Sequence, residues 1–216
     1  MRYIEIVRPY YRQLLFVVLA FTTMVGVSFW YVKDIVQQQT EMNGNAAMDS
    51  ANATIRSLLA ETEVSLINVV FTVEEMISRG ESQESVLEHI TNLTDWYYAK
   101  AQRYFAFNGI YGYIRGEYLD GAGWVPPDDY NPVARPWYVG AIKSRGQIHY
   151  TDPYVDADTG KVIISTSQQV FTKKRQISGV VSIDFDITAV AEYIKTLHPA
   201  GGGYGFLLND KMELVA

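Results

Sequence analysis

The chain has 216 residues and a formal net charge of −6, and 48% of its residues are hydrophobic. The acidic balance argues against nucleic acid as the main partner, and the hydrophobic fraction excludes a wholly disordered protein. The absence of cysteine excludes disulfide scaffolds, thiolate metal sites and cysteine nucleophiles. Because the three histidines, His89, His149 and His198, are widely spaced, we expect neither a metal nor another cofactor.

Residues 13–32 form an apolar segment without Asp, Glu, Lys or Arg. A helix of about twenty residues spans about 30 Å, which matches the hydrocarbon core of a membrane. Three arginines and one glutamate precede the segment, a balance of +2, whereas one lysine and two acids follow within twelve residues, a balance of −1. The positive-inside rule then places residues 1–12 in the cytoplasm and the chain after about residue 33 outside.

A cleaved signal peptide is the competing interpretation of this segment. Its best cleavage site would lie at Gly26-Val27-Ser28, but apolar residues continue past that site to Val32. We therefore expect an uncleaved single-pass anchor in the inner or plasma membrane of a bacterium, with the remainder extracytoplasmic.

The anchor is expected to continue into a long outer helix over residues 33–80. From Asp34 to Arg79 there is no proline, Gly44 is the only glycine, and apolar residues recur at helical spacing. Gly80 is the predicted end of the helix. A helix of this length cannot bury its apolar stripe alone, so we expect it to pack on its own domain, on a second copy, or on both, with a homodimer through this helix as the expected assembly.

The remaining segments alternate between helical and β-rich patterns. Ser85 and Glu88 form a candidate capping box for a second helix that runs to about Lys100. Four β-rich runs and two short helices follow, separated by turn signals. The runs are Ile110–Leu119, Ile148–Asp156, Val162–Phe171 and Ser178–Ile187, and the helices are Pro136–Ser144 and Ala189–Leu197.

These elements predict an α+β fold with a mostly antiparallel sheet and short flanking helices. Three consecutive glycines at 201–203 read as a linker, after which Tyr204–Ala216 resembles a fresh hairpin. Residues 81–198 are thus expected to form one module, and residues 199–216 to be the beginning of a second, truncated one.

One element, centred on Arg135, has the chemistry of an anion site. Arg135 precedes a proline and is biased toward extended geometry, and Pro136 is favoured as the first residue of a helix. The guanidinium thus lies beside free backbone N–H groups and the positive end of a helix dipole. With the Trp137 indole and the Tyr138 hydroxyl as further donors, the element is suited to a carboxylate.

A complementary group of residues follows downstream. Tyr154 and Asp156 lie two apart on a strand and so share a face. Asp184 lies among apolar neighbours, and a buried carboxylate needs a cation. That cation is either Arg135, which would make an internal salt bridge with Asp184 or with Asp156, or the ammonium of a ligand. In the second case the two poles describe a pocket for a free α-amino acid.

These residues resemble the double Cache family of bacterial extracellular sensors. These PAS-like modules occur on chemoreceptors, sensor histidine kinases and cyclic-dinucleotide enzymes. The resemblance rests on one anchor, a long outer helix, Arg135-Pro136-Trp137-Tyr138, Tyr154-Val155-Asp156 and the run Gly179–Asp184. It implies a membrane-distal PAS-like module followed by a membrane-proximal one.

The spacing Tyr130, Arg135, Trp137, Tyr138, Tyr154, Asp156 and Asp184 resembles the amino-acid-binding subset of that family. The resemblance implies that Arg135, Trp137 and Tyr138 hold the ligand carboxylate. It also implies that Tyr130, Asp156 and Asp184 hold the amine, with Asp186 as an alternative to Asp184. An aromatic lining for the ligand side chain is expected between Tyr97 and Tyr118, from Tyr104, Phe105, Phe107, Tyr111 and Tyr113.

The predicted function is the extracytoplasmic, ligand-sensing region of a bacterial signalling receptor that binds an amino acid or amine. The alternative is a structural or partner-binding surface module in which Arg135 and Asp184 neutralise each other. Because no phosphate loop, nucleophile motif or metal cluster occurs, the chain is not expected to be an enzyme. A histidine kinase or diguanylate cyclase is conceivable as an output domain beyond residue 216.

Overall fold

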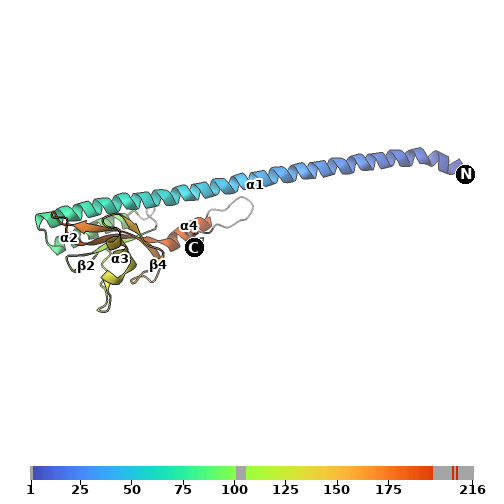
Figure 1. Ribbon diagram of the computed structural model, residues 1–216. Coiled ribbons are helices and arrows are strands. Elements are labelled where there is room, and N and C mark those ends of the chain that lie inside the picture. Colours follow the sequence, from blue (N-terminus) through green and yellow to red (C-terminus); the bar gives the residue numbers. More distant parts are fainter. Residues whose placement is uncertain (1, 101–105, 197–205, 207, 209–216) are drawn as a thin grey trace. The chain divides into compact units, whose positions relative to one another are not determined.

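The computed structural model describes residues 2–100, 106–196, 206 and 208 (Figure 1). Its helices and strands confirm the predicted α+β class. The chain divides into two units, one holding residues up to Asp49 and the other the described residues from Ser50 onward. In chain order the elements are α1 (Arg2–Arg79), α2 (Gln83–Tyr98), β1 (Phe107–Ile114), β2 (Glu117–Asp120), η1 (Pro132–Ala134), α3 (Pro136–Lys143), β3 (His149–Tyr150), β4 (Tyr154–Val155), β5 (Val162–Phe171), β6 (Ile177–Asp186) and α4 (Ile187–Thr196).

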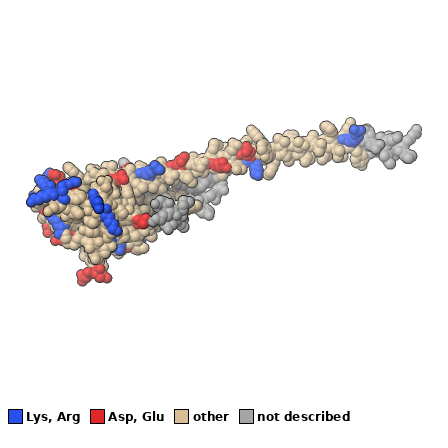
Figure 2. All heavy atoms as spheres, viewed as in Figure 1, with Lys and Arg blue, Asp and Glu red and all other residues tan. Residues whose placement is uncertain are grey.

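The N-terminal part of α1 is apolar and exposed. Phe16 and Phe29 are 74% and 70% exposed, and few charged atoms lie along this stretch in Figure 2. Helix α1 is long and apolar enough to cross a membrane, as the hydropathy of residues 13–32 predicts. The helix is continuous to Arg79, because residues 34–79 contain no proline and only one glycine.

The predicted helix end at Gly80 is confirmed. Gly80 adopts a φ of 76°, and the N–H of Glu81 donates to the carbonyl of Met76 at 3.1 Å, which closes the last turn. The predicted cap of the second helix is wrong. Ser82 is the N-cap of α2, and its hydroxyl accepts from the N–H of Ser85 at 3.2 Å. Because the Ser82 hydroxyl satisfies one of the free N–H groups at the start of a helix, α2 begins at Gln83, earlier than predicted.

The sheet is antiparallel throughout, with the strand order β2-β1-β6-β5-β3 and β4 also paired to β5. The long central strands β5 and β6 lie where the sequence predicts them. The predicted run Ile110–Leu119 is instead a hairpin, because Arg115 and Gly116 both adopt positive φ, 50° and 85°. That backbone matches the twist of a two-residue hairpin. The predicted run Ile148–Asp156 is divided between β3 and β4.

The two faces of the sheet have different partners. In Figure 1, α1 and α3 lie on opposite sides of the sheet. On β6, Val181 and Ile183 belong to the core that α1 and α2 cover, while Val180 packs with Trp137 of α3 on the opposite side. The side chains of a strand alternate between faces, so Ser182 and Asp184 also lie on the α3 side. Helices α1 and α2 therefore close one face, and the polar chemistry gathers on the other.

Gly121, directly after β2, lets α2 approach the sheet closely. A Cβ at this position would come within 2.7 Å of the Ile90 carbonyl and 2.8 Å of the Ile110 carbonyl. We expect Gly121→Ala to lower the free energy of unfolding by about 1–3 kcal/mol, because neither backbone can yield easily. Urea denaturation would measure this. Gly44→Ala is the control, since nothing lies within 4 Å of Gly44; equal stability of the two variants would contradict the prediction.

Candidate functional site

Arg135 lies at the start of α3, as the sequence predicts. Its backbone is extended, with φ −76° and ψ 149°, and Pro136 begins the helix. One Nη donates to the carbonyl of Val155 at 2.9 Å, and the guanidinium carbon lies 5.3 Å from the centroid of the Tyr154 ring and 5.9 Å from that of Tyr130. These contacts hold the guanidinium in place without neutralising it.

The charge of Arg135 is not matched within the described part of the chain. No carboxylate oxygen there lies within 4.0 Å of its guanidinium nitrogens. Its Nε is buried and has no hydrogen-bond partner among the described residues. The alternative in which Asp156 or Asp184 forms an internal salt bridge with Arg135 is therefore not what the structure shows.

Asp184 is buried near the C-terminal end of β6, with 4% of its surface exposed. Its Oδ1 accepts from the Tyr111 hydroxyl at 2.8 Å and from the Ser165 hydroxyl at 2.5 Å. These neighbours come from β1 and β5, the two strands beside β6. Burial raises the pKa of Asp184 to about 7; the two hydrogen bonds act to lower it, and the charges of Asp156 and Asp120 act to raise it.

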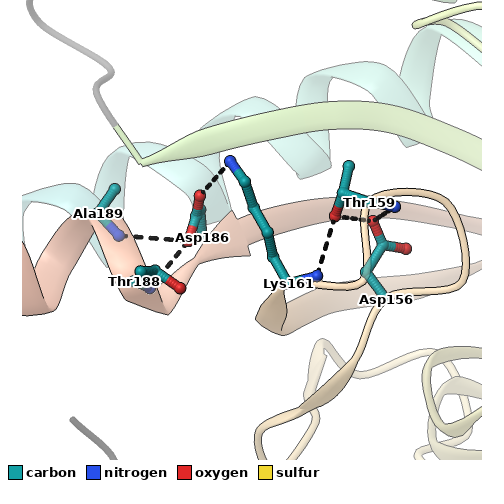
Figure 3. A network of polar contacts seen from close by, with 6 residues as sticks. All are labelled: Asp156, Thr159, Lys161, Asp186, Thr188 and Ala189. Atoms are coloured by element: carbon teal, nitrogen blue, oxygen red, sulfur yellow. Dashed lines mark hydrogen bonds and ion pairs between the residues drawn. The ribbon is translucent and has the colours of Figure 1, made fainter.

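Asp186, the predicted alternative to Asp184, interacts with a lysine and with the start of a helix. Its Oδ2 accepts from Lys161 Nζ at 2.8 Å, and its Oδ1 accepts from the N–H groups of Thr188 and Ala189 at the start of α4 (Figure 3). Burial acts to raise the pKa of Asp186, but the hydrogen bonds and the lysine charge outweigh it, so that the pKa is lowered. Asp186 thus caps a helix and pairs with a cation.

Tyr154 and Asp156 come from β4 and the loop after it. The Tyr154 hydroxyl lies 2.6 Å from the Ser165 hydroxyl, which links it to Asp184. Asp156 accepts from the N–H and the hydroxyl of Thr159 at 3.1 and 2.6 Å, as Figure 3 shows. These bonds shape the loop and fix one oxygen of the carboxylate.

Trp137 and Tyr138 turn in different directions, because successive residues of a helix are 100° apart. Trp137 is buried and packs edge-on against Tyr111 at 5.0 Å between ring centroids. Tyr138 packs against Tyr113, with 5.9 Å between ring centroids. Burial raises the pKa of Tyr130, while its hydrogen bond with Trp137 acts to lower it. Tyr138 also contacts the Trp137 ring, with 5.6 Å between centroids, but its own ring is directed toward Tyr113.

A pocket joins most of these residues. Its empty volume is about 420 Å³, including the part that opens to solvent. Six of the seven predicted site residues line it, namely Tyr130, Arg135, Trp137, Tyr154, Asp156 and Asp184, and Tyr138 does not. Whether each of them contacts a ligand stays a prediction. The sequence reasoning missed further lining residues, which are Asn108, Gly109, Tyr118, Asp120, Ala122, Trp124 and Asp158.

A hairpin turn at Arg115-Gly116 would have indicated that Asp120 belongs to the site. Had Arg115-Gly116 been recognised as a hairpin turn, Tyr111 would have been expected opposite Asp120, which is the observed register. Of the predicted aromatic lining, Tyr111 faces the pocket, whereas Phe107 stacks on Tyr97 at 4.7 Å in another part of the core. Tyr104 and Phe105 lie outside the described residues. Among the described residues no group of three or more His, Asp or Glu is placed to hold a metal ion.

The sequence matches a known family over more than half of its length. Residues 73–192 fit the profile described as methyl-accepting chemotaxis protein-like, first PDC sensor domain. McpB of Bacillus subtilis (strain 168), a methyl-accepting chemotaxis protein, is 29% identical over 183 residues, which cover 82% of this chain and 26% of McpB. McpG of Pseudomonas putida is 34% identical over 89 residues, 41% of this chain and 14% of McpG. The chain thus spans about a quarter of McpB.

Solved structures share the fold. The ligand-binding domain of the Pseudomonas aeruginosa amino-acid chemoreceptor PctB, in complex with L-Gln, superposes with a TM-score of 0.63 at 21% identity, over 79% of this chain and 65% of that one. The corresponding domain of PctC with GABA gives 0.62 at 20% identity, over 77% and 71%. The ligand-binding domain of Mlp24 with asparagine gives 0.62 at 22% identity, over 83% and 72%.

Proposed function

Because the chain belongs to the family of first PDC sensor domains of methyl-accepting chemotaxis protein-like receptors, we propose that its pocket binds a free α-amino acid or a related amine. The observation that carries the proposal is that Arg135 and two acids, Asp156 and Asp184, line one pocket. No described carboxylate lies within 4.0 Å of the guanidinium. The guanidinium is therefore available for the carboxylate of a zwitterion, and the two acids are available for its ammonium.

In this proposal Arg135 grips the ligand carboxylate, with Trp137 beside it. Asp184 and Asp156 receive the ammonium, and Tyr130 adds an aromatic face that favours a cation. The role that the family resemblance implies for Tyr138 at the carboxylate requires a different orientation of its side chain from the one against Tyr113. The ligands of PctB and PctC, L-Gln and GABA, both carry an amine and a carboxylate, which supports this assignment.

Isothermal titration calorimetry on the 216-residue chain in detergent micelles tests the proposal. The titrants are the common L-amino acids and GABA, each with its decarboxylated or deaminated analogue as the control. We expect at least one intact amino acid to bind and its two truncated analogues to bind far more weakly, because each lacks one pole. Failure of every amino acid to bind would overturn the proposal and favour a structural or partner-binding module.

We further propose that residues 1–12 are cytoplasmic, that α1 anchors the chain in a bacterial inner membrane, and that residues 81–198 form the membrane-distal sensor module. The charge balance around residues 13–32 and the membrane-receptor relatives support this.

Ligand binding would favour one packing of the long helices in the dimer. That packing would tilt or displace the part of α1 that lies in the membrane. The relatives are methyl-accepting chemotaxis proteins, which favours a chemotaxis output over the kinase or cyclase considered from the sequence. Residues 199–216 would begin the membrane-proximal module, and they lie outside the described residues except 206 and 208.

A homodimer through α1 completes the proposal. Between residues 50 and 71, α1 carries an exposed, uncharged row of side chains spaced alternately three and four residues apart, which is the heptad pattern of two paired helices. This outer stripe consists of Ser50, Ala53, Ser57, Ala60, Val64, Ile67 and Phe71. It lies apart from the buried residues of α1, so a second copy has access to it.

Because the chain has no cysteine, single-cysteine variants report on this pairing directly. We expect Ala53→Cys and Ile67→Cys to form disulfide-linked dimers on mild oxidation in membranes, because the outer stripe of one helix faces that of its partner. Asn52→Cys is the matched control, since it is exposed one residue away from the stripe. Non-reducing electrophoresis gives the measurement, and equal cross-linking of Asn52→Cys and Ala53→Cys would count against the interface.

A further inference from the structure

The pocket contains more negative charge than an ordinary amino acid can balance. Arg135 is the only Lys, Arg or His among its described lining residues. Four carboxylates line the same pocket, namely Asp120, Asp156, Asp158 and Asp184. In the proposed function Arg135 takes the ligand carboxylate, and Asp156 with Asp184 takes the ammonium. Two acids, Asp120 and Asp158, are then left without a partner of opposite charge.

The two carboxylate oxygens of Asp120 have different hydrogen-bond partners. Its Oδ1 accepts from the N–H of Ala122 at 2.8 Å, which is an ordinary hydrogen bond for an aspartate at the end of a strand. Its Oδ2 accepts only from the Tyr118 hydroxyl at 3.1 Å among the described residues, so this oxygen has a second lone pair for a ligand donor. Burial raises the pKa of Asp120 even though these hydrogen bonds act to lower it, and the charge of Asp158 adds to the rise.

Asp158 lies on the exposed loop that follows Asp156. Its backbone N–H donates to Asp156 Oδ1 at 3.4 Å, and both residues line the pocket. Burial and the charge of Asp156 raise the pKa of the Asp158 carboxyl. A cation that entered between these acids would relieve this repulsion.

We propose that the ligand is an amino acid with a cationic side chain, such as lysine, ornithine or arginine, whose second charge is received by Asp120 and Asp158. This inference rests on the proposed function and goes beyond it by naming the class of side chain. The independent sign of a ligand is the buried Nε of Arg135, which has no hydrogen-bond partner among the described residues and lines the same pocket. A dicarboxylic amino acid would be repelled, and an aliphatic one would leave the half-buried Asp120 desolvated and without a counter-charge.

The test compares amino acids that differ only in side-chain charge: L-lysine with L-norleucine, and L-arginine with L-citrulline. Calorimetry on the 216-residue chain in detergent micelles is expected to give at least about tenfold tighter binding to the cationic member of each pair. Asp120→Asn and Asp158→Asn should each reduce that preference, because each variant weakens the binding of the cationic member of each pair. Glu117→Gln, an exposed acid on the same strand as Asp120, is the matched control and should change neither.

The outcomes separate the two claims. Equal or tighter binding of the neutral members, or a cationic preference that survives in both Asn variants, overturns the inference while the amino-acid sensor stands. Absence of binding by any amino acid overturns the proposed function, and the inference with it. Because Asp158 is exposed, Asp158→Asn should fold even if the turn at Asp120 does not tolerate the amide.

Discussion

Arg135→Ala is expected to weaken amino-acid binding by at least about thirtyfold, which corresponds to 2 kcal/mol or more and reaches about 5 kcal/mol if the ligand carboxylate is fully desolvated. The physical reason is that no other cation among the described lining residues can replace the guanidinium. An unpaired carboxylate in a partly closed pocket loses its hydration without recovering a counter-charge. Calorimetry with the amino acid that binds the unmodified chain gives the measurement.

Two further variants make this result specific to Arg135. Lys143→Ala removes a positive charge from the exposed end of the same helix, and it should bind the ligand as the unmodified chain does. Arg135→Lys keeps the charge but loses the planar, two-pronged donor, so we expect an intermediate loss. A melting temperature close to that of the unmodified chain would show that Arg135→Ala is folded. Undiminished affinity in that folded variant would eliminate the assigned role.

Asp184 is expected to make the ligand-free domain less stable as the pH rises. The pKa of its carboxyl is about 7 in the folded chain, against an ordinary value of 3.8. Between these values the folded state holds a proton that the unfolded state has lost, so the contribution of Asp184 to stability is full below about pH 4 and is lost as the pH rises to about 7. The largest change in the free energy of unfolding that this difference in pKa allows is on the order of 4 kcal/mol. Thermal melts at pH 5 and pH 8 measure the change.

Ligand binding should have the opposite dependence on pH. An ammonium is received by the charged carboxylate, so affinity should rise by up to about tenfold per pH unit until pH 7 and then level off. Below pH 7 the ligand should displace a proton, which calorimetry detects by repeating the titration in buffers of different ionisation enthalpy. Asp184→Asn should remove this contribution to both the melts and the proton release, whereas Asp128→Asn, in an exposed loop, should retain it. An unchanged pH profile in Asp184→Asn would contradict the assignment.

Much of the fold was predictable because its signals are local. The helix end at Gly80 and the start of α3 at Pro136 follow from backbone preferences of single residues. The long strands β5 and β6 follow from continuous β-rich runs. The hairpin turn at Arg115-Gly116 was missed, because a non-glycine residue at positive φ leaves no clear sequence signal.

The candidate site was only partly predictable for a related reason. Asp184 and Asp186 share a face by alternation, and the sequence offered no ground to choose between them. The structure separates them, because α4 begins at Ile187 and Lys161 lies beside Asp186, while Asp184 is enclosed by Tyr111 and Ser165. These partners come from other strands, which spacing along one strand cannot reveal.

The sequence by itself determined an apolar segment long enough to cross a membrane, a long helix, an antiparallel sheet and an arginine at a helix start, since each depends on residues that are neighbours along the chain. Only the tertiary structure decided that no carboxylate among the described residues pairs with Arg135, that Tyr138 packs against Tyr113, and that Asp120 and Asp158 line the pocket. The physical reason is that burial and charge pairing depend on which distant strands and loops meet. Those meetings are set by the packing of the whole sheet and not by any one segment.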